Sequence, residues 1–231
     1  MKPICTAVIV AAGKGKRMGT EISKQFLPMG GKEILAHTVE KFEKAEKIRD
    51  IILVTGADSK QDVQEMAQEY GWKKIRSVVA GGKERQDSVW NGLREVSDDT
   101  EIVLIHDGVR PFVTEDILNG SIETTLEMGG CVAGVPAKDT IKVCNRENIA
   151  VETPDRSTLW QIQTPQTFRR ERIIKAYEQA KADGFVGTDD ASLAEHSGYP
   201  VKVIMGSYRN IKITTKEDLL IGEAFLKEEQ A

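Results

Sequence analysis

The chain has few of the residues that cross-link small proteins or hold metal ions directly. Its three cysteines, Cys5, Cys131 and Cys144, are odd in number and lack the CxxC spacing of a zinc site. The three histidines form no HxxxH pair. We therefore expect no zinc site, and the cysteine usage favours a reduced, cytoplasmic setting in which the thiols are small core or surface groups.

Long apolar segments and a one-sided charge are also missing. The apolar N-terminal stretch 4–12 is shorter than the ~20 residues of a membrane helix, and it continues into the charged segment 13–17 instead of a signal-peptide cleavage site. Lys+Arg number 32 against 36 Asp+Glu, which gives a net charge of −4. We expect a soluble protein without a membrane or nucleic-acid partner, so any phosphate chemistry must use a local cluster of positive charge.

Apolar patterning is typical of a single α/β domain spanning residues 1–231. Hydrophobic residues make up 40% of the chain and charged residues 29%, which excludes a mostly disordered protein. Short apolar runs alternate with longer amphipathic ones. The pattern predicts a Rossmann-like, mostly parallel sheet with helices on both faces, whose ligands bind beyond the carboxyl ends of the strands. The expected strands are Ile4–Val10, Asp50–Thr55, Lys74–Val79 and Glu101–His106, and the expected helices are Glu33–Ala45, Asp58–Tyr70, Arg85–Val96 and one that Thr114 caps and that ends at Gly129-Gly130.

The pattern changes after Cys131. A strand over Val132–Pro136 is followed by two short alternating segments, 140–144 and 149–153, around a polar turn. This predicts a protruding β-arm at about residues 137–160. Arms of this kind often exchange across a two-fold axis, so we expect a homodimer. The remaining expected elements are a helix over Arg169–Ala182, a short helix capped by Thr188, a strand over Val201–Met205, an extended Ile211–Ile213 and a last helix capped by Thr215.

A glycine-rich loop, residues 11–19, directly follows the first strand. Its glycines let the backbone approach a ligand and present N–H groups to phosphate oxygens. The spacing is neither that of a Walker A motif nor the GxGxxG of a dinucleotide site. Lys14, Lys16, Arg17 and Lys24 concentrate positive charge there. We therefore predict polyphosphate binding, with these cations stabilising a departing pyrophosphate.

A second loop of interest follows the strand that ends at His106. Asp107 is the carboxylate best placed to serve Mg²⁺, either as a direct ligand or as an acceptor behind it, because Mg²⁺ prefers oxygen donors and takes most of them from phosphates and water. We expect His106 to be a packed strand-end residue instead of a base. The attacking group in such chemistry is a phosphate oxygen already ionised at neutral pH, so no general base is needed.

Segments along nearly the whole chain, from about residue 4 to 225, resemble one family of nucleotidyltransferases. The matching motifs occur in the family's order, and the ordered set is more specific than any one of them. They are Ala11-Ala12-Gly13-x-Gly15-x-Arg17-Met18, Lys24-Gln25-Phe26-Leu27, Gly81-Gly82-x-x-Arg85-x-x-Ser88, His106-Asp107-x-x-Arg110-Pro111, Asp139-Thr140, Asp155-Arg156, Gln163-Thr164-Pro165-Gln166-x-Phe168, Thr188-Asp189 and Asn210-Ile211-Lys212. The chain thereby resembles the 2-C-methyl-D-erythritol 4-phosphate cytidylyltransferases, whose fold is of the nucleotide-diphospho-sugar transferase type.

The resemblance implies a reaction between CTP and 2-C-methyl-D-erythritol 4-phosphate, with Mg²⁺, that yields the cytidine diphosphate derivative and pyrophosphate. It assigns Arg17 and Lys24 to stabilising the α-phosphate during transfer. It assigns nucleotide contacts to Ala11, Ala12, Gly13, Gly15, Gly82 and Ser88, the last two selecting the pyrimidine, and we add Lys14 of the charged loop to this nucleotide-binding set. The polyol phosphate and metal region would be formed by Asp107, Arg110, Thr140, Arg156, Thr164, Thr188 and Lys212, with Thr140 and Arg156 reaching the neighbouring subunit's site. Position 83, often acidic in relatives, is Lys83 here, and we leave it outside the predicted site.

Three other functions are compatible with parts of this pattern. A cytidylyltransferase for another polyol phosphate, such as ribitol 5-phosphate, shares the glycine loop and the QTPQ segment. A nucleotide sensor without activity could use the same sheet, although it would not need both Arg17 and Lys24. The loop spacing disfavours an NAD-dependent oxidoreductase.

Overall fold

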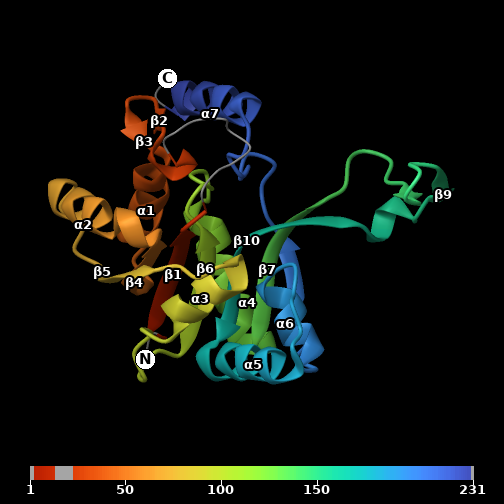
Figure 1. Ribbon diagram of the computed structural model, residues 1–231, viewed down its shortest axis with the longest axis horizontal. Coiled ribbons are helices and arrows are strands. Elements are labelled where there is room, and N and C mark those ends of the chain that lie inside the picture. Colours follow the sequence, from red (N-terminus) through yellow and green to blue (C-terminus); the bar gives the residue numbers. More distant parts are fainter. Residues whose placement is uncertain (1–2, 14–22, 230–231) are drawn as a thin grey trace.

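The computed structural model describes residues 3–13 and 23–229, and its centre is a seven-stranded sheet (Figure 1). The strand order is β11-β7-β10-β6-β1-β4-β5, and only β10 runs antiparallel to its neighbours. This confirms the predicted mostly parallel α/β sheet. The strands are β1 (Cys5–Ala11), β4 (Ile48–Thr55), β5 (Ile75–Ala80), β6 (Ile102–Asp107), β7 (Gly130–Pro136), β10 (Trp160–Arg169) and β11 (Lys202–Met205).

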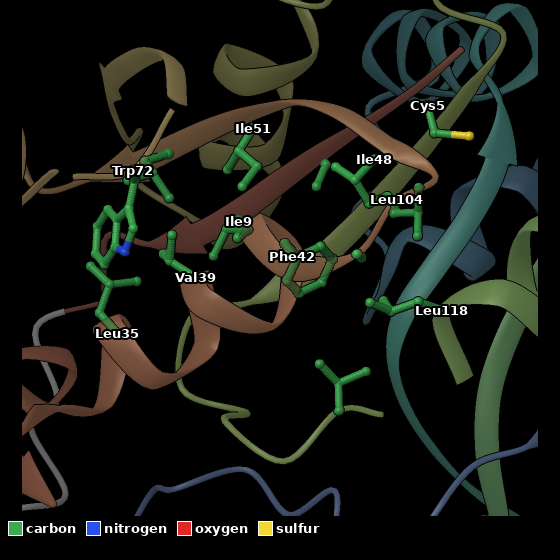
Figure 2. Close-up of a cluster of buried hydrophobic side chains, with 14 of the residues drawn as sticks. Cys5, Ile9, Leu35, Val39, Phe42, Ile48, Ile51, Trp72, Leu104 and Leu118 are labelled. Carbon is green, nitrogen blue, oxygen red and sulfur yellow. The ribbon is translucent and has the colours of Figure 1, made fainter. Parts of the chain in front are cut away.

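Helices cover both faces of the sheet because successive strand residues point to opposite sides. Ala7 and Ile9 of β1 pack with α1, α2 and α4, whereas Val8 between them packs with α3, α5 and α6. Figure 2 shows Ile9, Val39 and Phe42 meeting in the first of these cores. The helices are α1 (Ile34–Lys44), α2 (Lys60–Glu69), α3 (Arg85–Leu93), α4 (Glu115–Met128), α5 (Arg170–Asp183), α6 (Asp190–His196) and α7 (Lys216–Glu229).

Short elements connect these layers. The hairpin β2–β3 and helix α7 enclose a third small core with Met29, Phe112 and Ile213. Among the described residues, no helix combines the length and apolar character needed to cross a bilayer. The short elements are η2 (Lys24–Phe26), β2 (Pro28–Met29), β3 (Lys32–Glu33), η3 (Ala57–Ser59), β8 (Val143–Cys144), β9 (Ala150–Glu152) and η4 (Arg156–Thr158).

Helix ends follow the expected chemistry, with one correction. The Thr114 side chain accepts a hydrogen bond from the Ile117 amide at the start of α4, and Gly129 ends that helix with a left-handed φ of 86°. The prediction that Thr188 caps the short helix is wrong. Asp189 is the cap, because its carboxylate accepts from the Ser192 amide at 2.9 Å, and Thr188 lies one residue before the cap position.

Strand β10 is the one central element that the sequence pattern did not predict. It runs antiparallel between β6 and β7, and its residues 163–168 are buried although most of them are polar. A strand without an apolar run gives no hydrophobic signal. Its polar side chains instead have specific partners: Gln163 accepts from the Asn210 side-chain amide at 3.2 Å, and the Thr167 hydroxyl donates to Ser121 at 3.0 Å.

The predicted arm is present, and Figure 1 shows it extending away from the body of the molecule with β9 near its outer end. Strands β8 and β9 pair antiparallel around a turn in which Asn148 has a φ of 61°. Almost every residue from 138 to 162 is exposed, including the apolar side chains of Ile149 and Val151. The arm therefore buries little apolar surface within its own chain.

Candidate active site

A cavity of about 460 Å³ opens at the carboxyl ends of β1 and β6, where the sheet topology predicts ligand binding. Five segments far apart in sequence line it: the end of β1 with the loop after it, the start of η2, the start of α3 with the turn before it, the end of β6 with the loop after it, and Lys212. The cavity brings together the predicted residues Ala11, Ala12, Gly13, Lys24, Gly82, Ser88, Asp107 and Lys212. The predicted residues Lys14, Gly15 and Arg17 lie outside the described part of the chain.

The turn before α3 is fixed by Ser88. Its hydroxyl accepts a hydrogen bond from the Gly82 amide at 3.0 Å and donates one to the Glu84 carbonyl at 3.0 Å. A Cβ atom at Gly81 would lie only 2.4 Å from the Cβ of Ala12, so the turn can approach the β1 loop only with glycine there. Ser88 thus shapes the cavity wall with both of its hydrogen-bonding functions already engaged.

Asp107 is the centre of the site's charge. The residue is 7% exposed, and its carboxylate lies 2.9 Å from Lys212 Nζ, 3.4 Å from Arg85 Nε and 3.4 Å from Arg110 Nε. Burial alone would raise the pKa of Asp107, but Lys212, Arg85 and Arg110 outweigh it and hold that pKa well below its usual range. Asp107 is therefore a permanent anion among three cations.

His106 lies behind this cluster and is fully buried. Its ring packs on Phe42 with centroids 4.9 Å apart, and its two nitrogens lie 3.0 Å from Thr164 Oγ1 and 3.1 Å from the Arg110 carbonyl. Burial lowers the pKa of His106 to about 4. The ring is a packed strand-end residue, as expected, and it does not line the cavity.

Comparison with known proteins shows the family to which the chain belongs. The model of the family described as IspD, 2-C-methyl-D-erythritol 4-phosphate cytidylyltransferase, matches residues 5–228. The chain belongs to this cytidylyltransferase family. The resemblance stated from the sequence motifs is thereby confirmed.

Relatives in the cytidylyltransferase family are similar over almost their full length. A 2-C-methyl-D-erythritol 4-phosphate cytidylyltransferase from Geotalea uraniireducens (strain Rf4) is 52% identical, covering 96% of each chain. One from Alkaliphilus metalliredigens (strain QYMF) is 49% identical, covering 96% of this chain and 93% of the relative. The crystal structure of the 4-diphosphocytidyl-2C-methyl-D-erythritol synthase from Anaerococcus prevotii DSM 20548 superposes with a TM-score of 0.87 at 34% identity, covering 98% of this chain and 97% of the other.

Other cytidylyltransferase motif residues lie away from the cavity of their own chain. Thr140 and Arg156 are exposed on the arm, where the Arg156 guanidinium donates to the Lys138 carbonyl at 2.8 Å. Thr188 is exposed just before α6. Within one chain these three residues are not brought together with Asp107.

Two further motif residues support Asp107 from the buried side. Thr164 is 3% exposed, and its hydroxyl accepts from the Asp107 amide at 3.1 Å. Arg110 contacts Asp107 and donates to the Asn210 carbonyl at 2.8 Å. In this chain both of them orient Asp107.

Sequence reasoning gave no site role to several residues that line the cavity, among them the polar residues Gln25, Lys83 and Arg85. Gln25 is 2% exposed in η2, directly after Lys24. Arg85 stood in a quoted motif without a role, yet it binds both Asp107 and the buried Asp190. Its spacing from Gly82 was the signal that could have found it. Lys83 was set aside because relatives often carry an acidic residue there.

Proposed function

We propose that the chain catalyses the reaction of CTP with 2-C-methyl-D-erythritol 4-phosphate to give 4-diphosphocytidyl-2-C-methyl-D-erythritol and pyrophosphate, in isoprenoid precursor biosynthesis. The observation that carries the proposal is one cavity in which the β1 loop, Lys24 and the Asp107 cluster meet, in a chain that matches the family model over residues 5–228. The names of the relatives support the choice of this polyol phosphate over ribitol 5-phosphate.

The proposed mechanism is in-line attack of the acceptor phosphate on the α-phosphate of CTP. An ionised phosphate oxygen is the nucleophile, so the enzyme has to position two anions and neutralise the leaving pyrophosphate. The residues suit that task. Lys24 and Lys212 place ammonium groups on the cavity wall, and the sequestered His106 is consistent with a reaction that uses no base. Arg17 adds a guanidinium by resemblance alone.

The donor set fits a Mg²⁺ ion carried by the nucleotide. Among the described residues, no group of three or more His, Cys, Asp or Glu side chains could hold a metal by itself. Asp107 is a permanently ionised carboxylate at the cavity wall, and a Mg²⁺ ion that keeps phosphate oxygens and waters needs only one such ligand or acceptor. When bound, Mg²⁺ would neutralise phosphate charge while Asp107 orients it.

We also propose a cytoplasmic homodimer joined through the arm. Exposed Ile149 and Val151 supply apolar surface that a partner copy would cover. Thr140 and Arg156 lie on the same arm, away from their own cavity. Exchange of arms would place both residues in the neighbouring subunit's site, next to the acceptor phosphate.

Pyrophosphate release tests the proposal. The enzyme is assayed with each of the four nucleoside triphosphates and 2-C-methyl-D-erythritol 4-phosphate, and then with CTP and a mixture of this acceptor and ribitol 5-phosphate. We expect CTP and the methylerythritol acceptor to give the highest kcat/KM. Higher turnover of ribitol 5-phosphate would reject the substrate, and CTP binding without pyrophosphate release under any acceptor would indicate a sensor.

A further inference from the structure

Asp190 is fully buried beside the site, and the mechanism above gives it no role. Its carboxylate accepts two hydrogen bonds from Arg85, with Nη1 3.1 Å from Oδ1 and Nη2 2.8 Å from Oδ2. A fork of this kind fixes the plane of a guanidinium group. Only the Nε edge of Arg85 remains directed toward Asp107, at the long distance of 3.4 Å.

Asp190 and the residues beside it are held by two other elements. The Tyr177 hydroxyl of α5 donates to Asp190 Oδ1, and Tyr177 is buried. Gln166 of β10 accepts from the Ala191 amide at 2.9 Å and donates to Asp189 at 2.8 Å, which fixes the first turn of α6. These contacts account for Gln166 and Asp189, which the sequence motifs contain and the proposed chemistry does not use.

The distances show how Arg85 divides its charge between two carboxylates. It is bound tightly to Asp190 and loosely to Asp107, while Lys212 contacts Asp107 at 2.9 Å. Burial disfavours the charge on Arg85, but Asp190 and Asp107 outweigh it and raise the pKa of Arg85, so the guanidinium stays charged. Without Asp190, its remaining anionic partner among these residues would be Asp107.

We propose that Asp190, held by Tyr177, is a positioning residue that keeps Arg85 from closing onto Asp107. Asp107 then stays paired with Lys212 and directed toward the cavity. This inference rests on the proposed function, because the geometry it protects is that of the cytidylyl-transfer site. Asp190 also cancels the charge of Arg85, which limits the net positive charge of the cavity wall.

The charge-removing variant Asp190→Asn separates positioning from folding. Arg85 should move onto Asp107 and disturb its pairing with Lys212, which lowers kcat about 10- to 100-fold, the range for a small misplacement of reacting groups. At the same time the cavity gains positive charge, so the KM for CTP should stay the same or fall. A loosened fold would instead raise that KM and lower the melting temperature together.

Tyr177→Phe is a second, milder variant. It keeps the ring that stacks on Trp90, with centroids 5.9 Å apart, and removes only the hydroxyl. We expect kcat to fall about 3- to 10-fold, the effect of one hydrogen bond. Because Tyr177 acts through Asp190, the double variant should have the kcat of Asp190→Asn alone. If Asp190→Asn does not fold, Tyr177→Phe still tests the inference.

The matched control is Asp99→Asn. Asp99 receives the same two-bond contact from Arg49, at 2.7 and 2.9 Å, but on the exposed surface away from the cavity. Its kcat and KM should equal those of the wild type. If the wild-type enzyme releases pyrophosphate and the kcat of both Asp190→Asn and Tyr177→Phe equals that of the wild type, the positioning role is overturned while the proposed function stands. A wild-type enzyme that releases no pyrophosphate from CTP and the methylerythritol acceptor would overturn the proposed function, and this inference with it.

Discussion

The site at Asp107 and the arm are built on opposite principles. Asp107 is 7% exposed and contacts three cations, each contributed by a different segment of the chain. The arm is exposed along most of its length, and its strands β8 and β9 pair only with each other. Preorganised charge requires the first kind of structure. An exposed arm, in contrast, offers surface that a second molecule can cover. Changes at the Asp107 site should therefore affect catalysis, whereas changes on the arm should affect association between copies.

Removal of Lys24 should give the largest effect. Lys24→Ala deletes a cation on the cavity wall that is proposed to act on developing charge, and kcat should fall on the order of 10²–10³-fold while the KM for CTP changes less. Lys60→Ala, at an exposed position of α2, is the control and should leave both constants unchanged. A change confined to the KM for CTP would show that Lys24 only binds the nucleotide. Arg17→Ala is expected to behave like Lys24→Ala.

Acid should destabilise the site region through His106. The pKa of this buried ring is about 4 in the folded chain and about 6.5 when unfolded, so between these values the unfolded state binds a proton that the folded state does not. Stability is therefore lost as the pH falls from about 6.5 to about 4, by roughly 3 kcal/mol in all.

Urea unfolding at a series of pH values measures this loss. His106→Gln cannot take up the proton, so its free energy of unfolding should vary less over the same range. Lys60→Ala, at an exposed position of α2, is the control and should keep the slope of the wild type. An unchanged slope in His106→Gln would contradict the assignment.

The difference between these regions also explains what the sequence could predict. Apolar runs predicted β1, β4 and β6, because burial on both sheet faces leaves a hydrophobic signal. The arm was predicted from alternation around a polar turn. Strand β10 was missed, since its buried residues are polar and gain stability from individual hydrogen bonds that depend on the complete fold.

Some parts of the candidate site could likewise be predicted from the sequence, and others could not. The β1 loop and Asp107 follow strands and could be located from the sequence as strand ends. The contact between Arg85 and Asp190 joins residues 105 positions apart. Neither residue type nor local spacing indicates such a pairing, which only the packing of α3 against α5 and α6 creates.

Arg156 brings the two regions together if arms exchange between subunits. Arg156→Ala should raise the KM for the acceptor about tenfold with a smaller change in kcat, because it removes a phosphate contact. Arg146→Ala, also exposed on the arm, is the control and should change neither. An unchanged acceptor KM in Arg156→Ala would remove that residue from the site.

Mixing of subunits tests the exchange itself. A dimer of one Lys24→Ala and one Arg156→Ala subunit has one intact site only if each arm serves its neighbour. Random mixing should then restore about a quarter of the wild-type sites, since half the dimers are mixed and each of those has one complete site of two. Activity equal to the average of the two separate variants would show that each arm serves its own chain.

The smallest effect on folding should come from the tip of the arm. Val151 is 63% exposed, so Val151→Ser removes almost no buried apolar surface within the chain, and its free energy of unfolding should stay within about 0.5 kcal/mol of the wild type when the variant is compared as a monomer. Its dissociation into monomers on dilution, measured by sedimentation, should nevertheless occur at a higher concentration, because a covered valine would be lost from the interface. Val186→Ser provides the control, as Val186 is 76% exposed on the body. Equal dissociation of the two variants would mean that the arm's apolar face is not where the copies meet.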